Sequence, residues 1–178
     1  TPGAPNSGTD WEFRIYINVQ WEIAPYSAAE LVIMAFSANG YSWTGYDRGS
    51  VGYATRIFTP SLVPGQFDKD HVGWFKVLKL SPTNWIAFYS GGGSSTTYQN
   101  LNGIGFATSV DGISWTRHGA ILVADGLTGP MWRRYSAWMP SFIKADSKYE
   151  VLFLGSTNPD IVSSDWIQWK LGRFVFSF

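Results

Sequence analysis

Apolar and polar residues alternate with a period of two in several short segments of this 178-residue chain. In residues 11–18, for example, every second residue is a large apolar one. This period predicts a β-strand. Further short strands are predicted at 19–23, 31–37, 50–56, 72–80, 85–90, 104–109 and 120–123. No segment has helical periodicity, and turn signals such as Asn-Gly and Asp-Gly separate the strands, so the sequence predicts an all-β fold.

Three of these segments return at a constant offset of 53 in residue number. The segment SVGYAT at 50–55 returns as GIGFAT at 103–108, VQW at 19–21 as VGW at 72–74, and IMAFS at 33–37 as IAFYS at 86–90. A period of about 50 residues indicates a unit of several strands that must stack on copies of itself to bury its faces. We therefore predict a β-propeller-like array of about three blades, each of them an antiparallel meander.

The repeat predicts an N-terminal arm and strand at 1–18 and a propeller-like repeat domain at 19–178, with units at about 19–65, 66–125 and 126–178. The third unit is the least regular. Its segments 141–144, 151–155 and 171–172 resemble 76–79, 86–90 and 104–105, so the offset between the two units is not constant. The third unit lacks a fourth strand, and residues 11–18 are a candidate to supply that strand, within the chain or across a subunit boundary.

Three blades do not close a propeller, for which about four is the usual minimum. An open array would leave long strand edges exposed, and proteins avoid such edges. We therefore expect a homo-oligomer, such as two chains in a six-bladed ring, or a place in a longer polypeptide or a larger assembly.

Charge and composition exclude several function classes. Lys plus Arg and Asp plus Glu are both 13, and this balance argues against nucleic acid and anionic membranes as partners. No apolar run approaches the roughly 18 residues of a membrane-spanning helix, so we expect no membrane insertion. With no Cys and two His, few ligands are available for a transition metal, so we expect no metal and no cofactor, while a calcium site made of loop carbonyls and Asp stays open as an alternative. Aromatic residues make up 17% of the chain, so some aromatic surface is expected at subunit contacts or in a ligand site.

Residues 104–117, IGFATSVDGISWTR, carry the most specific motif of the chain. This segment resembles the one that ends a blade in the five-bladed β-propeller glycosidases, namely glycoside hydrolase family 43 and its relatives. In such a motif Asp111 and Gly112 close a tight turn, because the Asp accepts backbone hydrogen bonds and the Gly adopts a positive φ. Trp115 then packs back over the blade. The resemblance covers residues 66–123 best, and 19–65 and 136–173 less well.

The catalytic residues that the resemblance implies are not carried over. Those enzymes place carboxylates on the innermost strands of successive blades, in a phrase of the type Asp-Pro-Ser-Val. Here Met139 stands where the Asp is expected, and the offset of 53 places Trp74 and Trp21 at the equivalent positions. Glycosidases need two carboxyl groups about 5–10 Å apart. The sequence therefore favours a module that is not an enzyme.

Trp21, Trp74 and Trp138 recur once in each unit, if Trp138 rather than the adjacent Met139 is taken in the third. In one interpretation they pack between blades as part of the core. In the other they form stacking platforms for the apolar faces of sugar rings. The sequence leaves both interpretations open.

Five other residues are candidates for the site. His71 follows Asp70 at the start of a predicted inner strand, and a carboxylate beside an imidazole can transfer protons, although a polar loop is the plainer interpretation. Arg133 and Tyr135 precede the third inner strand, where Arg suits bidentate contact with an acidic sugar or, alternatively, a subunit contact. Glu22 is the glutamate nearest an inner strand, and with Asp70 it is a weak candidate for catalysis.

The sequence thus predicts a non-catalytic, lectin-like propeller module that binds carbohydrate or a protein. We expect it outside a cell or on the surface of a virus particle. Two alternatives remain open: a glycosidase fragment of the five-bladed propeller type, and a structural subunit of an assembly such as a virion or phage tail.

Overall fold

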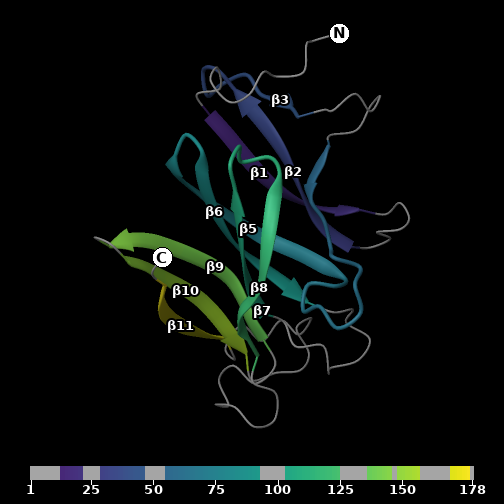
Figure 1. Cartoon of the computed structure of the whole chain (residues 1–178), viewed down its shortest axis with the longest axis vertical. Helices are drawn as coiled ribbons and strands as arrows, with labels where there is room; N and C mark the ends of the chain where they lie inside the picture. The colour runs from purple at the N-terminus through teal and green to yellow at the C-terminus, as the bar shows by residue number, and fades with distance from the viewer. Residues whose placement is uncertain are drawn as a thin grey trace.

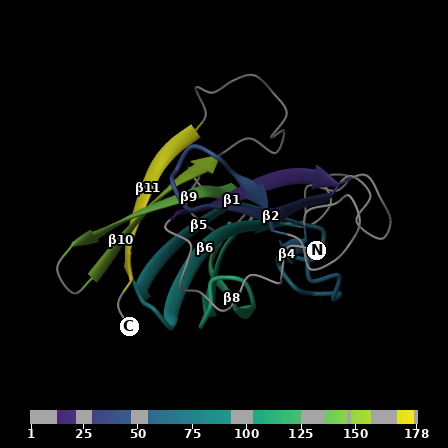
Figure 2. The same cartoon turned by 90° about the horizontal axis from the view of Figure 1, so that it is seen from above.

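The computed structural model describes residues 13–21, 29–46, 55–92, 103–124, 136–145, 148–156 and 169–176. These residues form three antiparallel sheets and no helix, which confirms the prediction of an all-β, propeller-like array of meanders. We name them sheets A, B and C in chain order, and Figure 1 shows them following one another down the long axis. Figure 2 shows the same sheets from above. No helix that could cross a membrane occurs in this described part of the chain.

The strands follow the chain order within each sheet. Sheet A contains β1 (Phe13–Trp21), β2 (Ala29–Ser37), β3 (Thr44–Gly45) and β4 (Arg56–Phe58), with β3 and β4 both paired to β2. Sheet B contains β5 (His71–Ser81), β6 (Asn84–Gly92), β7 (Gly103–Ser109) and β8 (Trp115–Val123), in that order. Sheet C contains β9 (Ser136–Ala145), β10 (Lys148–Ser156) and β11 (Trp169–Phe176), in that order.

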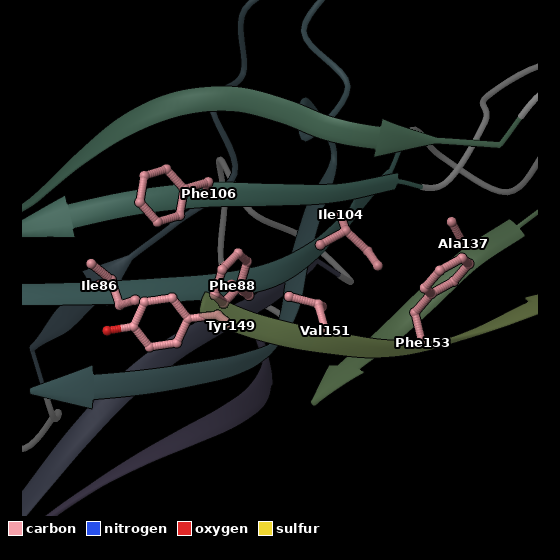
Figure 3. Packing of buried hydrophobic residues seen from close by; sticks show 8 residues of the cluster. All are labelled: Ile86, Phe88, Ile104, Phe106, Ala137, Tyr149, Val151 and Phe153. Carbon is pink, nitrogen blue, oxygen red and sulfur yellow. The ribbon is translucent and has the colours of Figure 1, made fainter. Parts of the chain in front are cut away.

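Sheet B is covered on both of its faces. One cluster of buried residues joins it to sheet A, with Val32 and Phe58 packed among residues of sheet B. A second cluster joins it to sheet C, and Figure 3 shows its eight members: Ile86, Phe88, Ile104, Phe106, Ala137, Tyr149, Val151 and Phe153. Because both faces are covered, β6 is buried at every position from its second residue onward. That double burial explains why β6 contains an uninterrupted apolar run.

Two turns of identical conformation mark the repeat of the fold. They are Ser37–Ser42 and Ser109–Ser114. In each, the Ser Oγ accepts the backbone N–H groups two and three residues later, at 3.2 and 2.9 Å in the first turn and 3.2 and 2.8 Å in the second. The Asn39 or Asp111 Oδ1 then accepts two further N–H groups, at 2.9 Å in the first turn and 2.8 Å in the second. The Gly that follows has a φ of 77° or 71°, which glycine adopts without strain.

The strands around the turns repeat in the same register, which we call the turn register. Phe13 pairs with Ser37 in sheet A, and Trp85 pairs with Ser109 in sheet B, so one constant offset carries both partners from sheet A to sheet B. Hence β1, β2 and β3 correspond to β6, β7 and β8. The offset of 53 between the first two units is therefore wrong, because alternating strands resemble one another in many registers. The unit boundaries drawn from the sequence remain a prediction.

Two consequences of the turn register correct the sequence prediction. Trp21 lies on β1, which corresponds to the second strand of sheet B, so it is not equivalent to Trp74 of the first strand β5. Within the chain, the described part of the segment 11–18 belongs to β1, which pairs with β2 in sheet A and not with a strand of sheet C, whereas a role across a subunit boundary stays a prediction. Among the described residues, sheet C has three strands.

Sheet C repeats sheet B as the sequence predicted, with one adjustment. β9 corresponds to β5 in the expected register, because Lys144 pairs with Tyr149 as Lys79 pairs with Trp85. β11 also corresponds to β7 in the expected register. Between β10 and β6 the register differs from the expected one by a single position, because Tyr149 occupies the place of Trp85.

Candidate functional site

The first strands of sheets B and C each contain a β-bulge, in which two residues lie opposite a single aromatic residue of the next strand. The pairs are Trp74 and Phe75 opposite Tyr89, and Met139 and Pro140 opposite Phe153. Trp74 has a φ of 46° and Met139 a φ of 54°, both in the left-handed region. A non-glycine residue there costs about 1–3 kcal/mol, and such residues cluster at functional sites. The two bulges are therefore the strongest structural candidates for a site.

A glycine of the third strand accommodates the ring opposite each bulge. Gly105 pairs with Tyr89, and Gly172 pairs with Phe153. A Cβ on Gly105 would lie under 3.0 Å from the Cζ of Tyr89, and a Cβ on Gly172 would lie equally close to the Cζ of Phe153. Each ring thus lies directly on the glycine backbone. The bulge, the ring and the glycine form one unit that the two sheets share.

A polar side chain from the preceding sheet binds each bulge. The Oγ of Ser90 on β6 accepts the backbone N–H of Met139 at 2.9 Å. The Oδ1 of Asn18 on β1 accepts the backbone N–H of Phe75 at 3.5 Å. In the turn register Asn18 corresponds to Ser90, so the two side chains occupy matching places in sheets A and B. Matching residues of the preceding sheets therefore anchor the two bulges, at the second bulge residue on β5 and at the first bulge residue on β9.

His71 and Trp138 meet where β5 and β9 begin. Their ring centroids are 5.0 Å apart in an edge-on arrangement. The Nε2 atom of His71 is buried and has no hydrogen-bond partner. Burial lowers the pKa of His71 to about 4, and the negative charge of Asp70 opposes this only in part. The imidazole is therefore neutral at neutral pH, and it packs edge-on against the ring of Trp138.

A carboxyl group that the sequence did not single out lies close to Gly73 on β5. The Oε2 atom of Glu30, on β2, is 2.6 Å from the position a Cβ on Gly73 would take, and the Asn18 amide is near the same point. Burial raises the pKa of Glu30 above its ordinary value. The sequence pattern gave no signal for this residue, because the contact joins a strand of one sheet to the first strand of the next.

The carboxylates before β5 have structural partners. Asp68 is 1% exposed, and its Oδ2 accepts the hydroxyl of Tyr89 at 3.0 Å and the Nε of Arg117 at 2.9 Å. Arg117 also donates to the carbonyl of Thr59 and lies over the Phe58 ring at 4.1 Å. Asp68 thus holds the segment before β5 against sheets A and B. Its neighbour Asp70 forms an ion pair with Lys69 at 3.2 Å.

The structure brings only some of the predicted site residues together. His71 and Trp138 are in contact, Asp70 adjoins them in the chain, and Trp74 lies three residues along β5 with its side chain 37% exposed. Trp138 corresponds to Gly73, whereas Met139 corresponds to Trp74, so the alignment of three tryptophans is wrong. The bulge fixes this pairing, and the sequence carries no sign of it.

The remaining predicted site residues lie outside the described part of the chain. These are Glu22, Arg133 and Tyr135, together with the side chain of Trp21. Their proposed roles stay predictions. In the described ranges, no three His, Asp or Glu side chains gather in a way that could hold a metal ion.

The fold is similar to that of several solved carbohydrate-active enzymes. A sucrose-6-phosphate hydrolase from Lactobacillus gasseri matches 96% of this chain with a TM-score of 0.65 and 14% identity. A structure described as a glycoside hydrolase matches 91% with a TM-score of 0.57 and 19% identity. An N-acetylgalactosamine deacetylase from F. plautii, solved with blood group B trisaccharide, matches 93% with a TM-score of 0.58 and 16% identity. No family model and no curated protein matches the sequence.

These matches support a propeller fold of the glycoside hydrolase type. At sequence identities this low they establish the fold alone. This chain spans 30%, 40% and 46% of the three structures, which is less than half of each. The particular resemblance to glycoside hydrolase family 43 remains an expectation from the motif at 104–117.

Proposed function

We propose that this chain is a carbohydrate-binding, propeller-type module that does not itself catalyse a reaction. The observation that carries the proposal is the pair of left-handed bulge positions on β5 and β9, which hold Trp74 and Met139. In the glycosidases that the sequence resembles, the innermost strands carry carboxylates. Trp74 leaves 37% of its surface exposed, and an exposed indole face binds the apolar face of a sugar ring.

The surroundings of the bulges support an aromatic, uncharged binding surface. His71 is neutral at neutral pH because burial lowers its pKa to about 4, and its ring packs on Trp138. The solved structures of similar fold include a sucrose-6-phosphate hydrolase and an N-acetylgalactosamine deacetylase, which fits a carbohydrate ligand. A protein ligand would use the same surface, and a glycan-binding assay distinguishes the two.

The substitution Trp74→Gly separates binding from packing. Glycine adopts a positive φ without strain, so we expect the melting temperature to stay the same or rise while glycan binding is lost. Binding is measured on a glycan array and then by calorimetric titration with the best ligand. Tyr41→Ala removes another aromatic side chain, which is 91% exposed, and serves as the control that keeps binding. A clear fall in melting temperature for Trp74→Gly would indicate core packing instead, and a wild-type chain that binds no glycan would contradict the proposal.

A catalytic role is the alternative, and one observation favours it. Glu30 is a partly buried carboxyl group with a raised pKa beside the first bulge, and such a group can donate a proton. With the earlier candidates Asp70 and Glu22, it would make the chain part of a glycosidase of the five-bladed type. This alternative predicts hydrolysis of aryl glycosides that is lost in Glu30→Gln, Asp70→Asn or Glu22→Gln. Absence of turnover on a broad substrate panel would remove it.

The location outside a cell or on a virus particle, and the role of a structural subunit, remain proposals from the sequence. A structural subunit would form a defined assembly and bind no glycan. The glycan array therefore tests that alternative at the same time.

A further inference from the structure

One face of sheet A is exposed, although the corresponding face of sheet B is buried. On β1, Arg14, Tyr16 and Asn18 all contact sheet B, so the residues between them point to the opposite side. On that opposite side Phe13 is 42% exposed and Ile15 is 44% exposed. We call the face formed by Phe13, Ile15 and the 44%-exposed Trp43 the open face of sheet A.

The turn register identifies the counterparts of this face in sheet B as Trp85, Ala87 and Trp115. Trp85 is 7% exposed and Ala87 is 0% exposed. Trp115 packs edge-on against Tyr16 of sheet A, with ring centroids 6.2 Å apart. Sheet A therefore covers this kind of face in sheet B. The molecule thus contains an example of what packs on the open face of sheet A.

Sheet C exposes the face that is directed away from sheet B. Tyr149, Val151 and Phe153 of β10 face sheet B, so the alternate residues of β10 and their partners on β11 point away from it. The open face of sheet C consists of Ile143, Leu171 and Val175, which are 57%, 69% and 50% exposed. Ile143 and Leu171 correspond to Leu78 and Ile104, which pack between sheets B and C.

We propose that the open face of sheet C docks on the open face of sheet A of a second copy of this chain. The junction of sheets A and B and the junction of sheets B and C each bring together the same two kinds of face. Among the described residues, one face of the first kind is exposed on sheet A and one face of the second kind is exposed on sheet C. Two copies joined at both ends would cover all four open faces, and closed symmetric assemblies are the common form of homo-oligomers.

Polar groups support the same pairing. At the junction of sheets A and B, Arg14 donates to the carbonyl of Asp111, and Tyr16 donates to the carbonyl of Gly112 at 2.9 Å. The turn at Asn39 in sheet A has the same conformation as the turn at Asp111. The open face of sheet C carries a guanidinium, that of Arg173, which Glu150 holds at 2.7 Å. Glu150 itself occupies the place of Arg14, so the guanidinium that it binds is the donor available near that place for the carbonyls of the turn at Asn39.

The test is the mass of the full chain in solution, measured by light scattering after size exclusion. We expect twice the 19.8 kDa of one chain. Ile15→Asp and Leu171→Asp each place a charge in one open face, so each variant alone is expected to halve the mass. Mixing the two variants leaves one intact pair of faces and is expected to restore the doubled mass. Val110→Asp changes a 70%-exposed turn residue outside both faces and is the matched control.

Three results would overturn the proposal: a wild-type chain with the mass of one copy, a Leu171→Asp variant that keeps the doubled mass, or a mixture that fails to restore it. The second result would indicate that sheet A docks on sheet A. Circular dichroism checks that each variant is folded. If Ile15→Asp does not fold, Trp43→Arg tests the same face from the residue that precedes β3.

Discussion

The bulges of sheets B and C share one backbone geometry, yet the rings that lie opposite them are held by different chemistry. In sheet B the hydroxyl of Tyr89 donates to the buried carboxylate of Asp68, which also binds Arg117. Burial and the Asp68 charge raise the pKa of Tyr89, so its hydroxyl stays protonated and donates. In sheet C the ring is Phe153, which packs near Phe174 with centroids 5.9 Å apart. The bulge and the glycine thus accommodate an aromatic ring in both sheets. Among the described residues, only the segment before the first strand of sheet B supplies an acceptor, Asp68, for a hydroxyl on that ring.

The largest expected difference between the two sheets comes from Asp68→Ala. The change removes a 1%-exposed carboxylate and leaves Arg117 and Tyr89 without their shared acceptor. Breaking such a pair by removing one partner costs about 3 kcal/mol or more when the pair is buried, and Arg117 is partly exposed, so we expect about 3 kcal/mol. Urea unfolding measures it. An effect below about 1 kcal/mol would mean that the network does not hold sheet B.

Gly105→Ala and Gly172→Ala test what the sheets share. Each new Cβ would lie under 3.0 Å from a ring carbon, so the ring and the bulge must shift. We expect both variants to lose about 1–3 kcal/mol of unfolding free energy, by similar amounts. Thr116→Ala, at an exposed position of β8, is the control and should stay within about 0.5 kcal/mol. A large loss in only one of the two would show that the bulge, ring and glycine do not act as one unit.

His71 gives sheet B a pH response that sheet C lacks, since the corresponding position on β9 is Ser136. Its folded pKa of about 4 lies below its ordinary value of 6.5. The unfolded chain therefore binds the proton first, and stability falls as the pH drops from 6.5 towards 4, by up to about 1.4 kcal/mol per pH unit. His71→Gln should flatten this part of the stability curve. Equal slopes in the wild type and His71→Gln would contradict the prediction.

Exchanging the two rings tests the contribution of the hydroxyl group alone. Tyr89→Phe gives sheet B the ring of sheet C and removes one hydrogen bond, so we expect a loss of about 1 kcal/mol. Phe153→Tyr brings a hydroxyl to a 2%-exposed position, and without a partner this should cost about 1–3 kcal/mol. Thermal unfolding of both variants measures the exchange. If Phe153→Tyr were neutral, sheet C would have a hydrogen-bond partner comparable to Asp68.

Strand positions were predictable from the sequence, but the register between the first two units was not. The strands β5, β6 and β7 lie where alternating or apolar runs predicted them, because each run is bounded by turn residues. The offset of 53 failed because one apolar strand matches another in any register that preserves its alternation. The turns Ser37–Ser42 and Ser109–Ser114 mark the correct register, since their side chains make specific hydrogen bonds that a shifted sequence could not make. Turn chemistry was thus the better guide to the repeat.

The candidate site was predictable only in part. The sequence pointed to Met139 through the resemblance of its segment to an inner-strand phrase and to Trp74 through the repeat, and the structure gives both the same bulge conformation. It did not point to Glu30, because the contact of Glu30 with Gly73 depends on how sheet A lies on sheet B. The bulges themselves leave no period in the sequence. Contacts between sheets therefore lay beyond what strand patterns could predict.

The two Ser-x-Asx-Gly turns also bear on how the chain folds. Every hydrogen bond that closes them joins groups two or three positions apart, so the turn at 109–114 needs no other sheet to form. Hairpins closed by such local contacts form in about 1–10 microseconds, well before distant segments meet. We expect each sheet to assemble from its own hairpins and then to pack on the exposed face of the sheet that precedes it in the chain. During synthesis, blades would accumulate in chain order from the N-terminal side.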